Sequence, residues 1–421
     1  MQFRAAIEQD AEDLQALTER AAGASAHPGF PAVPRFVGDD YADQERQLDT
    51  AAMDLRRHWL QIAHRPADAT LKSPCDGEVA HTPVGQTVCF GYEREIDISS
   101  IERRGEDYLD RVSGWASEVV LFRSGQAALS GLLHFAVNMW GSFGAVRVAH
   151  AGAYFETASL LKSWPGRVLR RSEAAADIVI AEPVWCDGAF SCTDTLPVAR
   201  RALILDTTLA GPGCDLRPYQ RTAECPLVIA YSSGLKLDQA GLELANVGIV
   251  RLYARRNVGA VAAALRDIRS LVGAGVTLDE MSALSAPWFM DRAYADRYVG
   301  AIFANNRRLA AAIGTRSPFF APHCHPSLRR QGADAPFCAL QLNEPSPRAY
   351  RALERLIELE CERRDIVVTK GGSFGFRGHR FELIEPERDQ GEPFLRVAMG
   401  WRDGWSCRRL CDLFEELAQG R

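Results

Sequence analysis

Short apolar runs alternate with helical patterns between Val119 and Leu252, and this alternation constrains the fold of the 421-residue chain more than any other feature. Helical patterns at Gln126–Met139 and Thr157–Trp164 lie between several of the runs. Strands that alternate with helices are typical of an α/β architecture with a mainly parallel sheet, whose chemically active loops follow the carboxyl ends of the strands. Seven strands are predicted, at Val119–Phe122, Val146–Ala149, Val168–Arg170, Ile178–Ala181, Ala202–Leu205, Leu227–Ala230 and Val247–Leu252.

Two further regions flank this segment. The first 70 residues read as polar helices, with the clearest amphipathic pattern at Gln44–His64, and residues 65–100 hold several Pro and Gly residues without a period. A second helical pattern follows at Glu102–Ala116. After the last apolar run the sequence is helical again, with one long helix predicted at Asp291–Ile313.

A smaller α+β unit closes the sequence. Its predicted elements are strands at Phe337–Leu342, Ile366–Thr369 and Phe394–Met399 and helices at Pro347–Arg364 and Trp405–Gln419. We therefore expect a helical segment and an arm over residues 1–100, a large domain over 101–290, and a linker helix with a small carboxyl-terminal domain over 291–421.

The composition argues against several classes of protein. The chain is 47% hydrophobic and 24% charged, which is ordinary for a globular protein, and a net charge of −5 gives no broad attraction to nucleic acid or an anionic membrane. The amino terminus is charged throughout and lacks the apolar run of a signal peptide. The uncharged stretch from Ser124 to Val146 contains Gln126, His134 and Asn138, so it predicts a buried helix and a turn rather than a membrane span.

The 11 cysteines are scattered singly, without a CxxC pair. This pattern predicts reduced thiols in a cytoplasmic protein and no structural zinc site. The sequence His323-Cys324-His325 lies in a Pro-rich stretch without a second pair of ligands, so we expect no metal there.

Lysine is scarce in this chain, because only four of its 49 basic residues are lysines. Lys236 alone lies among apolar and small residues at the end of a strand, in AYSSGLKLDQAG. A lysine can deprotonate and form an imine, which an arginine cannot. Taken alone, Lys236 would be interpreted as an ordinary surface lysine.

Two other strand ends carry matching chemistry. In ALILDTTLAGP an apolar strand delivers Asp206, which alone could also be a helix cap or a metal ligand. In LFRSGQAALSGLL a strand ends at Ser124 and opens a helix, whose free N–H groups beside Gly125 form an anion site. A phosphate site, a carboxylate and an imine-forming lysine are the three groups that pyridoxal 5′-phosphate requires. Tyr154, after the second strand, offers an aromatic ring to stack on the cofactor.

At these residues the sequence resembles the Cys/Met-metabolism family of fold-type I pyridoxal-phosphate enzymes, the relatives of cystathionine γ-synthase and methionine γ-lyase. The resemblance extends from about Tyr92 to Gly400. The family's Tyr-x-Arg phosphate clamp, which the partner subunit donates, is matched by Tyr92-Glu93-Arg94. Its Ser-Gly-Met-Ala-Ala phosphate loop is matched by Ser124-Gly125-Gln126-Ala127-Ala128.

The later motifs occur in the family's order. Tyr154 falls at the tyrosine that stacks on the cofactor ring. The family's Asp-Asn-Thr-x-Ala-Thr-Pro resembles Asp206-Thr207-Thr208-Leu209-Ala210-Gly211-Pro212, and its Ser-x-Thr-Lys resembles Ser233-Gly234-Leu235-Lys236. Its Ser-Leu-Gly-Gly resembles Ser373-Phe374-Gly375-Phe376, and the arginine that clamps the substrate carboxylate falls on Arg396.

The sequence also departs from the family. Trp185 stands where the family has an asparagine near the phenolic oxygen of the cofactor. Gln126 replaces the methionine of the phosphate loop, and Thr207 replaces the asparagine after the ring-nitrogen acid. These changes leave the substrate and the reaction outcome open.

The resemblance implies a fold-type I chain, with a mainly parallel seven-stranded sheet flanked by helices in the large domain and a smaller carboxyl-terminal α+β domain. It assigns the cofactor to Tyr92, Arg94, Ser124, Gly125, Gln126, Tyr154, Asp206, Thr208, Ser233 and Lys236. It assigns catalysis to Lys236, Tyr154 and Asp206, and substrate binding to Ser373 and Arg396. It also implies a homodimer with a shared active site, in which the arm reaches the partner subunit, and it leaves a tetramer open.

The activity implied is β- or γ-elimination, or γ-replacement, on an amino acid. S-Adenosylmethionine or an activated homoserine would be a suitable substrate, and the divergence suits specialised metabolism with C–C or C–S bond formation. An aminotransferase is the alternative within the same fold. A fold-type I scaffold that regulates or binds partners without catalysis is the alternative from another class.

Overall fold

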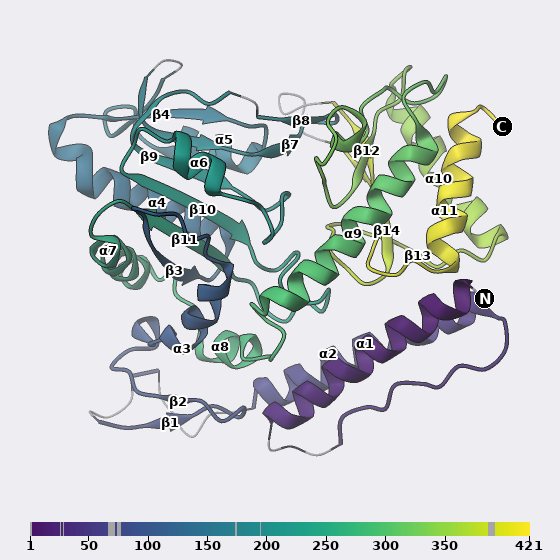
Figure 1. Ribbon diagram of the computed structural model, residues 1–421, viewed down its shortest axis with the longest axis horizontal. Coiled ribbons are helices and arrows are strands. Elements are labelled where there is room, and N and C mark those ends of the chain that lie inside the picture. Colours follow the sequence, from purple (N-terminus) through teal and green to yellow (C-terminus); the bar gives the residue numbers. More distant parts are fainter. Residues whose placement is uncertain are drawn as a thin grey trace.

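The computed structural model describes residues 2–25, 27, 29–65, 72–73, 77–172, 175–193, 195–385 and 392–421. Within these residues, a seven-stranded sheet and a four-stranded sheet lie in neighbouring parts of the molecule, with a long helix between them (Figure 1). Two amino-terminal helices run beside the part that contains the four-stranded sheet. No helix in the described part of the chain is long and apolar enough to cross a membrane.

The large sheet has the topology that the alternating pattern predicts. Strand β11 is antiparallel to both of its neighbours, and the other neighbouring pairs are parallel. In spatial order the strands are β3 (Ala116–Phe122), β11 (Gly248–Ala254), β10 (Leu227–Ser233), β9 (Ala199–Asp206), β6 (Ala176–Ala181), β4 (Val146–Ala151) and β5 (Leu169–Arg171). All seven expected strands are present, and the predicted fold class is confirmed.

Helices cover this sheet on both faces. On one face, α4 (Gly125–Trp140), α5 (Phe155–Ser163) and α7 (Val258–Leu271) bury leucines in one cluster with the strands. On the other face the cluster includes Leu216, at the start of α6 (Arg217–Thr222). Because the central strands are buried on both sides, their sequences are nearly continuous apolar runs.

The smaller sheet has the order β12 (Cys338–Leu340), β15 (Phe394–Ala398), β14 (His379–Ile384) and β13 (Val368–Lys370). Helices α10 (Pro347–Arg363) and α11 (Trp405–Ala418) pack on it, and α9 (Arg292–Ile313) contributes Leu309 to the same cluster. Strand β14 had no counterpart among the strands expected from the sequence. It is parallel to β13 and antiparallel to β15.

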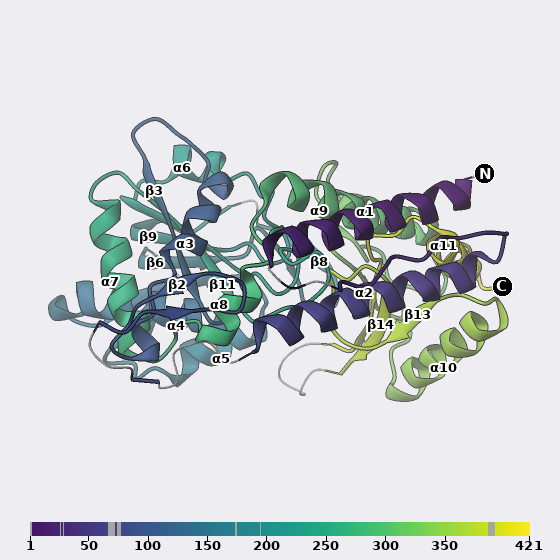
Figure 2. The same cartoon turned by 90° about the horizontal axis from the view of Figure 1, so that it is seen from below.

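The amino terminus forms two helices that lie side by side, α1 (Gln2–Ala24) and α2 (Tyr41–Ala63) (Figures 1 and 2). Their buried faces join one cluster with residues of α9 and of the small sheet. Trp59 Nε1 donates a hydrogen bond of 2.9 Å to the carbonyl of Ala283, in α8 (Leu278–Leu284). The first helices are therefore part of the packed core.

The arm that follows contains a small hairpin of β1 (Ala80–His81) and β2 (Thr87–Val88). The helix predicted at Glu102–Ala116 is wrong, because a turn containing Gly114 at φ +82° separates the short helical stretch from β3. The remaining short elements are η1 (Glu93–Glu95), α3 (Ser99–Glu102), η2 (Arg103–Tyr108), η3 (Gly141–Phe143), η4 (Pro326–Leu328), and the hairpin of β7 (Val184–Cys186) and β8 (Phe190–Cys192).

Candidate active site

The start of α4 meets the end of β10 at one edge of the large sheet. Ser124 caps the helix, because its Oγ accepts a hydrogen bond of 3.0 Å from the N–H of Ala127. A Cβ on Gly125 would lie 3.4 Å from Ser233, so the glycine brings the two segments into close contact. The N–H groups of Gly125 and Gln126, at the first helical positions, have no partner inside the helix and can receive an anion.

Asp206 ends β9 beside this helix start and is 9% exposed. Burial raises its pKa to about 6, hydrogen bonds from Thr208 act in the opposite direction, and the carboxylate of Glu182 adds to the rise. The N–H of Thr208 donates to Asp206 Oδ1 at 2.9 Å, and Thr208 Oγ1 accepts from the N–H of Ser233 at 3.1 Å. Thr208 therefore joins the aspartate to the end of β10.

Tyr154 stands at the start of α5 and is partly exposed. Its N–H donates to Glu182 Oε1 at 3.0 Å, which fixes its backbone. Burial raises the pKa of its hydroxyl above the ordinary value, as do the carboxylates of Glu156 and Asp206, while Gln126 lowers it. Asp206 and Gln126 therefore both lie near enough to the Tyr154 hydroxyl to act on it.

Lys236 follows β10 and points toward the small sheet. Its Nζ donates a hydrogen bond of 2.5 Å to Ser373 Oγ and lies 5.8 Å from the ring centre of Phe374. Burial lowers the pKa of Lys236; Glu243 opposes this shift and Arg396 adds to it. The amine is therefore closer to its neutral, nucleophilic form than an exposed lysine would be.

The turn after Lys236 is held by Gln239, which is completely buried. Its Nε2 donates to the carbonyls of Gly234 at 3.0 Å and Ala245 at 2.7 Å, and its Oε1 accepts from the N–H of Leu244 at 2.6 Å. These bonds replace the regular ladder where the strand ends, and they fix the position of the lysine.

Arg396 lies on β15 directly opposite Glu382 on β14, and the two form an ion pair. Glu382 Oε1 also accepts a hydrogen bond of 3.2 Å from the N–H of Ser373. The guanidinium carbon of Arg396 lies 5.4 Å from the ring centre of Phe337. Burial lowers the pKa of Arg396 to about 10, while Cys186 and Tyr154 act in the opposite direction.

Several solved structures resemble the chain. A methionine γ-lyase from Micromonospora echinospora matches with a TM-score of 0.52 and 18% identity, over 87% of this chain and 98% of that one. A cystathionine γ-synthase from Xanthomonas oryzae pv. oryzae in complex with cystathionine matches with a TM-score of 0.56 and 14% identity, over 86% and 98%. A cystathionine γ-lyase from yeast matches with a TM-score of 0.53 and 13% identity, over 86% and 96%. The chain has the fold-type I fold.

Comparison of the sequence alone gives no match. No protein-family model matches the chain, and neither does any curated protein sequence. The fold-type I assignment therefore rests on the three-dimensional arrangement, which survives sequence divergence because many residue combinations fill the same core.

Within the fold-type I chain, the site residues expected from the sequence lie together with two exceptions. The cofactor and catalytic candidates gather where α4, α5, β9 and β10 meet, and Ser373 and Arg396 approach Lys236 from the small sheet. Tyr92 and Arg94 lie elsewhere, in and beside η1, where Tyr92 is 55% exposed. Arg94 lies 5.2 Å from the ring centre of Tyr92, and its carbonyl accepts from Ser270 Oγ at 2.9 Å.

The structure adds three residues that sequence reasoning missed: Glu182, Gln239 and Glu382. Glu182 follows the apolar run of β6, and Gln239 lies three residues after the lysine, so their positions were visible in the sequence. Glu382 lies on the unexpected strand β14. Its importance depends on the register between β14 and β15, which the sequence pattern does not contain.

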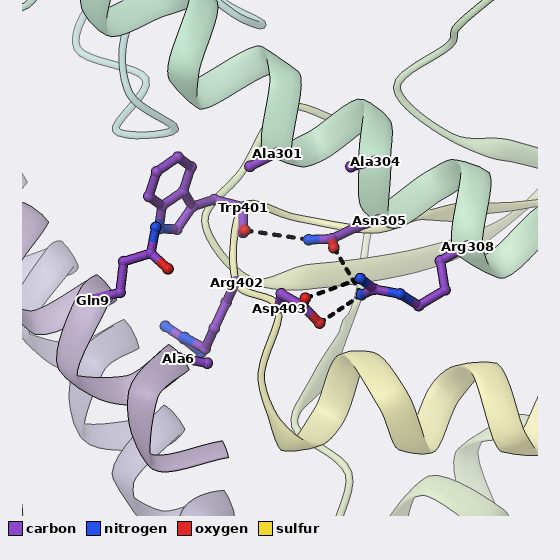
Figure 3. Close-up of a pocket in the computed structure, with 9 residues that line it drawn as sticks. All are labelled: Ala6, Gln9, Ala301, Ala304, Asn305, Arg308, Trp401, Arg402 and Asp403. Carbon is purple, nitrogen blue, oxygen red and sulfur yellow. Dashed lines mark hydrogen bonds and ion pairs between the residues drawn. The ribbon is translucent and has the colours of Figure 1, made fainter. Parts of the chain in front are cut away.

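The cavity drawn in Figure 3 is separate from this site. It has a volume of about 240 Å³ and lies between α1, α9 and the loop after β15. None of the residues assigned to the cofactor or the substrate lines it. Its charged groups are already paired, as Arg308 binds Asp403 through two hydrogen bonds of 2.5 and 2.9 Å.

Proposed function

We propose that the protein is a pyridoxal-phosphate-dependent enzyme that acts on an amino acid by β- or γ-elimination or by γ-replacement. The observation that carries this proposal is the position of Lys236 Nζ, which contacts Ser373 Oγ beside Arg396 while its strand borders Asp206 and the start of α4. The fold, shared with γ-lyase and γ-synthase structures, supports the same reaction class.

The residues present fit the cofactor. Asp206 is buried. Within the described part of the chain, the groups that shift its pKa are Thr208, Glu182 and Tyr231, and none of these is a cation. A buried carboxylate of this kind is suited to a protonated ring nitrogen brought by a ligand. The start of α4, with Ser124 and Ser233 beside it, offers N–H and hydroxyl donors suited to a phosphate.

When bound, pyridoxal phosphate supplies an electron sink for the carbanion at the substrate's Cα. Asp206 would hold the proton at the ring nitrogen. Lys236 would hold the aldehyde carbon and then move protons at Cα and Cβ, a task that its lowered pKa suits. Tyr154 would stack on the ring and pass a proton to the departing group.

Arg396 and Ser373 would bind the substrate's carboxylate and so select which bond at Cα lies perpendicular to the ring. Tyr92 and Arg94, which lie apart from this site in their own subunit, would contact the phosphate of a partner subunit in a homodimer. Substrates with a good γ leaving group, such as S-adenosylmethionine or an activated homoserine, are the candidates we favour, in a pathway that forms C–C or C–S bonds.

Absorbance tests the cofactor. Protein purified with pyridoxal phosphate should absorb near the visible edge, and Lys236→Ala should remove that band. Lys162→Ala, which changes an exposed lysine on α5, is the matched control and should leave the band unchanged. A wild-type protein that binds no pyridoxal phosphate would overturn the proposal.

Mass spectrometry of the products tests the reaction. The loaded enzyme is mixed with a panel of amino acids that includes S-adenosylmethionine and acylated homoserines. Elimination releases the side-chain group and gives a 2-oxo acid and ammonia, and replacement exchanges the side-chain group and gives a new amino acid. An aminotransferase would leave the cofactor in its amine form, and a non-catalytic scaffold would give no product.

A further inference from the structure

A carboxylate of the chain itself lies on the groups proposed to bind the substrate. Glu382 pairs with Arg396 across two neighbouring strands and accepts a hydrogen bond from the N–H of Ser373. Both side chains of the pair are about four-fifths buried, at 19% and 21% exposed. The pair is therefore shielded from water, which strengthens it relative to a surface pair.

The local backbone accommodates this arrangement. A Cβ on Gly372 would lie 3.0 Å from Glu382 Oε2, so a glycine there makes room for the carboxylate. Ser373 has φ +74°, a conformation that non-glycine residues seldom adopt. This conformation places its N–H on Glu382 while its Oγ accepts from Lys236. Ser373 thus joins the glutamate to the lysine.

The ion pair between Glu382 and Arg396 restricts how a substrate carboxylate can bind the guanidinium. A guanidinium offers a carboxylate two bidentate faces, Nη1 with Nη2 and Nε with Nη2. Glu382 takes Nη2, which both faces share, while Nε is buried without a hydrogen-bond partner in the described part of the chain. At either face a substrate carboxylate would share Nη2 with Glu382, and two carboxylates at one site repel each other.

We propose that Glu382 occupies the carboxylate subsite of the substrate-free enzyme and competes with the substrate for Arg396 and Ser373. This inference rests on the proposed function, because that function assigns Arg396 and Ser373 to the substrate. Glu382 is then a specificity-determining residue: it weakens the binding of every simple carboxylate, and a substrate must gain enough from its other contacts to displace it.

Binding of propionate, a carboxylate without an amine, tests this idea by calorimetry. Glu382→Gln keeps the size of the side chain and an acceptor for Ser373 but removes the charge. We expect its dissociation constant for propionate to be about tenfold lower than that of the wild type, because one repelling charge has gone. Glu385→Gln, which removes an exposed charge just beyond the same strand, is the matched control and should leave the constant unchanged.

Arg396→Ala should abolish propionate binding in both the wild-type and the Glu382→Gln background. Equal or weaker binding by Glu382→Gln, or no measurable binding by either protein, would overturn the inference. Glu382→Ala, read in the same assay, covers the case in which Glu382→Gln fails to fold. Visible absorbance reports cofactor binding separately, so loss of the proposed function is distinguishable from failure of this inference.

Discussion

Asp10 of α1 and Arg377, four residues after Ser373, form an ion pair that is closed to solvent, with exposures of 1% and 2%. Arg377 Nη2 also donates to Asp13 Oδ2 at 2.8 Å, and Asp10 Oδ2 accepts from Arg402 Nε at 2.7 Å. These contacts tie the first helix to the loop that carries Ser373. The amino-terminal helices carry none of the family's motifs, but these contacts hold in place the loop that contributes Ser373 to the candidate site.

Removing one charge from this network should destabilise the fold. We expect Asp10→Asn to lower the free energy of unfolding by about 3–5 kcal/mol, because Arg377 and Arg402 would remain buried with less counter-charge. Urea denaturation measures the change. Glu8→Gln on the same helix removes an exposed charge that pairs with Arg4 at the surface, and it should have little effect. Equal midpoints for Asp10→Asn and wild type would contradict this stabilising role.

Gly375 packs against the lysine turn and should not tolerate a side chain. Its φ is +86°, and a Cβ there would lie 2.0 Å from the carbonyl oxygen of Lys236. Gly375→Ala should cost about 2–4 kcal/mol of stability and should lower the affinity for pyridoxal phosphate, because the turn must move. Gly371→Ala, where the nearest atom is 3.9 Å away, is the control. Thermal melts and cofactor titration measure both effects; similar values for the two variants would argue against this packing.

Stability should depend on pH through Asp206. Burial raises its pKa to about 6 in the folded protein, from 3.8 in the unfolded chain. In the cofactor-free protein above pH 6, the buried charge should cost about 1–3 kcal/mol, so Asp206→Asn should be more stable than the wild type. As the pH falls from 6 toward 3.8, folded Asp206 binds a proton before the unfolded chain does, so the wild type gains stability and the difference shrinks.

Melting temperatures of both proteins at pH 8, 6 and 5 measure this change. A difference that stays constant with pH would show that Asp206 does not titrate in this range. With pyridoxal phosphate present the order at pH 8 should reverse, because only the carboxylate stabilises a protonated ring nitrogen.

The amine of Lys236 should be more reactive than the amine of Lys370. Burial lowers the pKa of Lys236, whereas hydrogen bonds and ion pairs with Glu358 and Glu354 raise that of Lys370. In cofactor-free protein at pH 8, we expect acetylation to modify Lys236 faster than Lys370, because only the neutral amine reacts. Peptide mass spectrometry gives the two rates. Pyridoxal phosphate should protect Lys236 alone; equal rates, or equal protection, would contradict its assigned role.

Much of the fold and part of the site could be predicted from local pattern. Strands buried on both faces require apolar runs, so the central strands of the large sheet were visible in the sequence. Lys236, Asp206 and Ser124 end such runs, and the ends of parallel strands meet at one edge of a sheet. Their proximity therefore followed from topology.

Other parts carried no local signal. Strand β14 mixes polar and apolar residues, so its sequence HRFELI lacks the run that marks the large sheet. The prediction of a helix at Glu102–Ala116 was wrong because the chain turns at Gly114. The amino-terminal helices were expected, but their partners were not, since an amphipathic pattern shows which face is buried and not what covers it.

The sequence by itself determined the strands of the large sheet and the chemical groups at their ends, because burial and backbone turns act on residues that are close along the chain. Only the tertiary structure decided which charges meet. Asp10 and Arg377 are 367 residues apart, and Glu382 faces Arg396 through the register of two strands. Such pairs depend on how whole elements pack, and they set the environment in which Lys236 works.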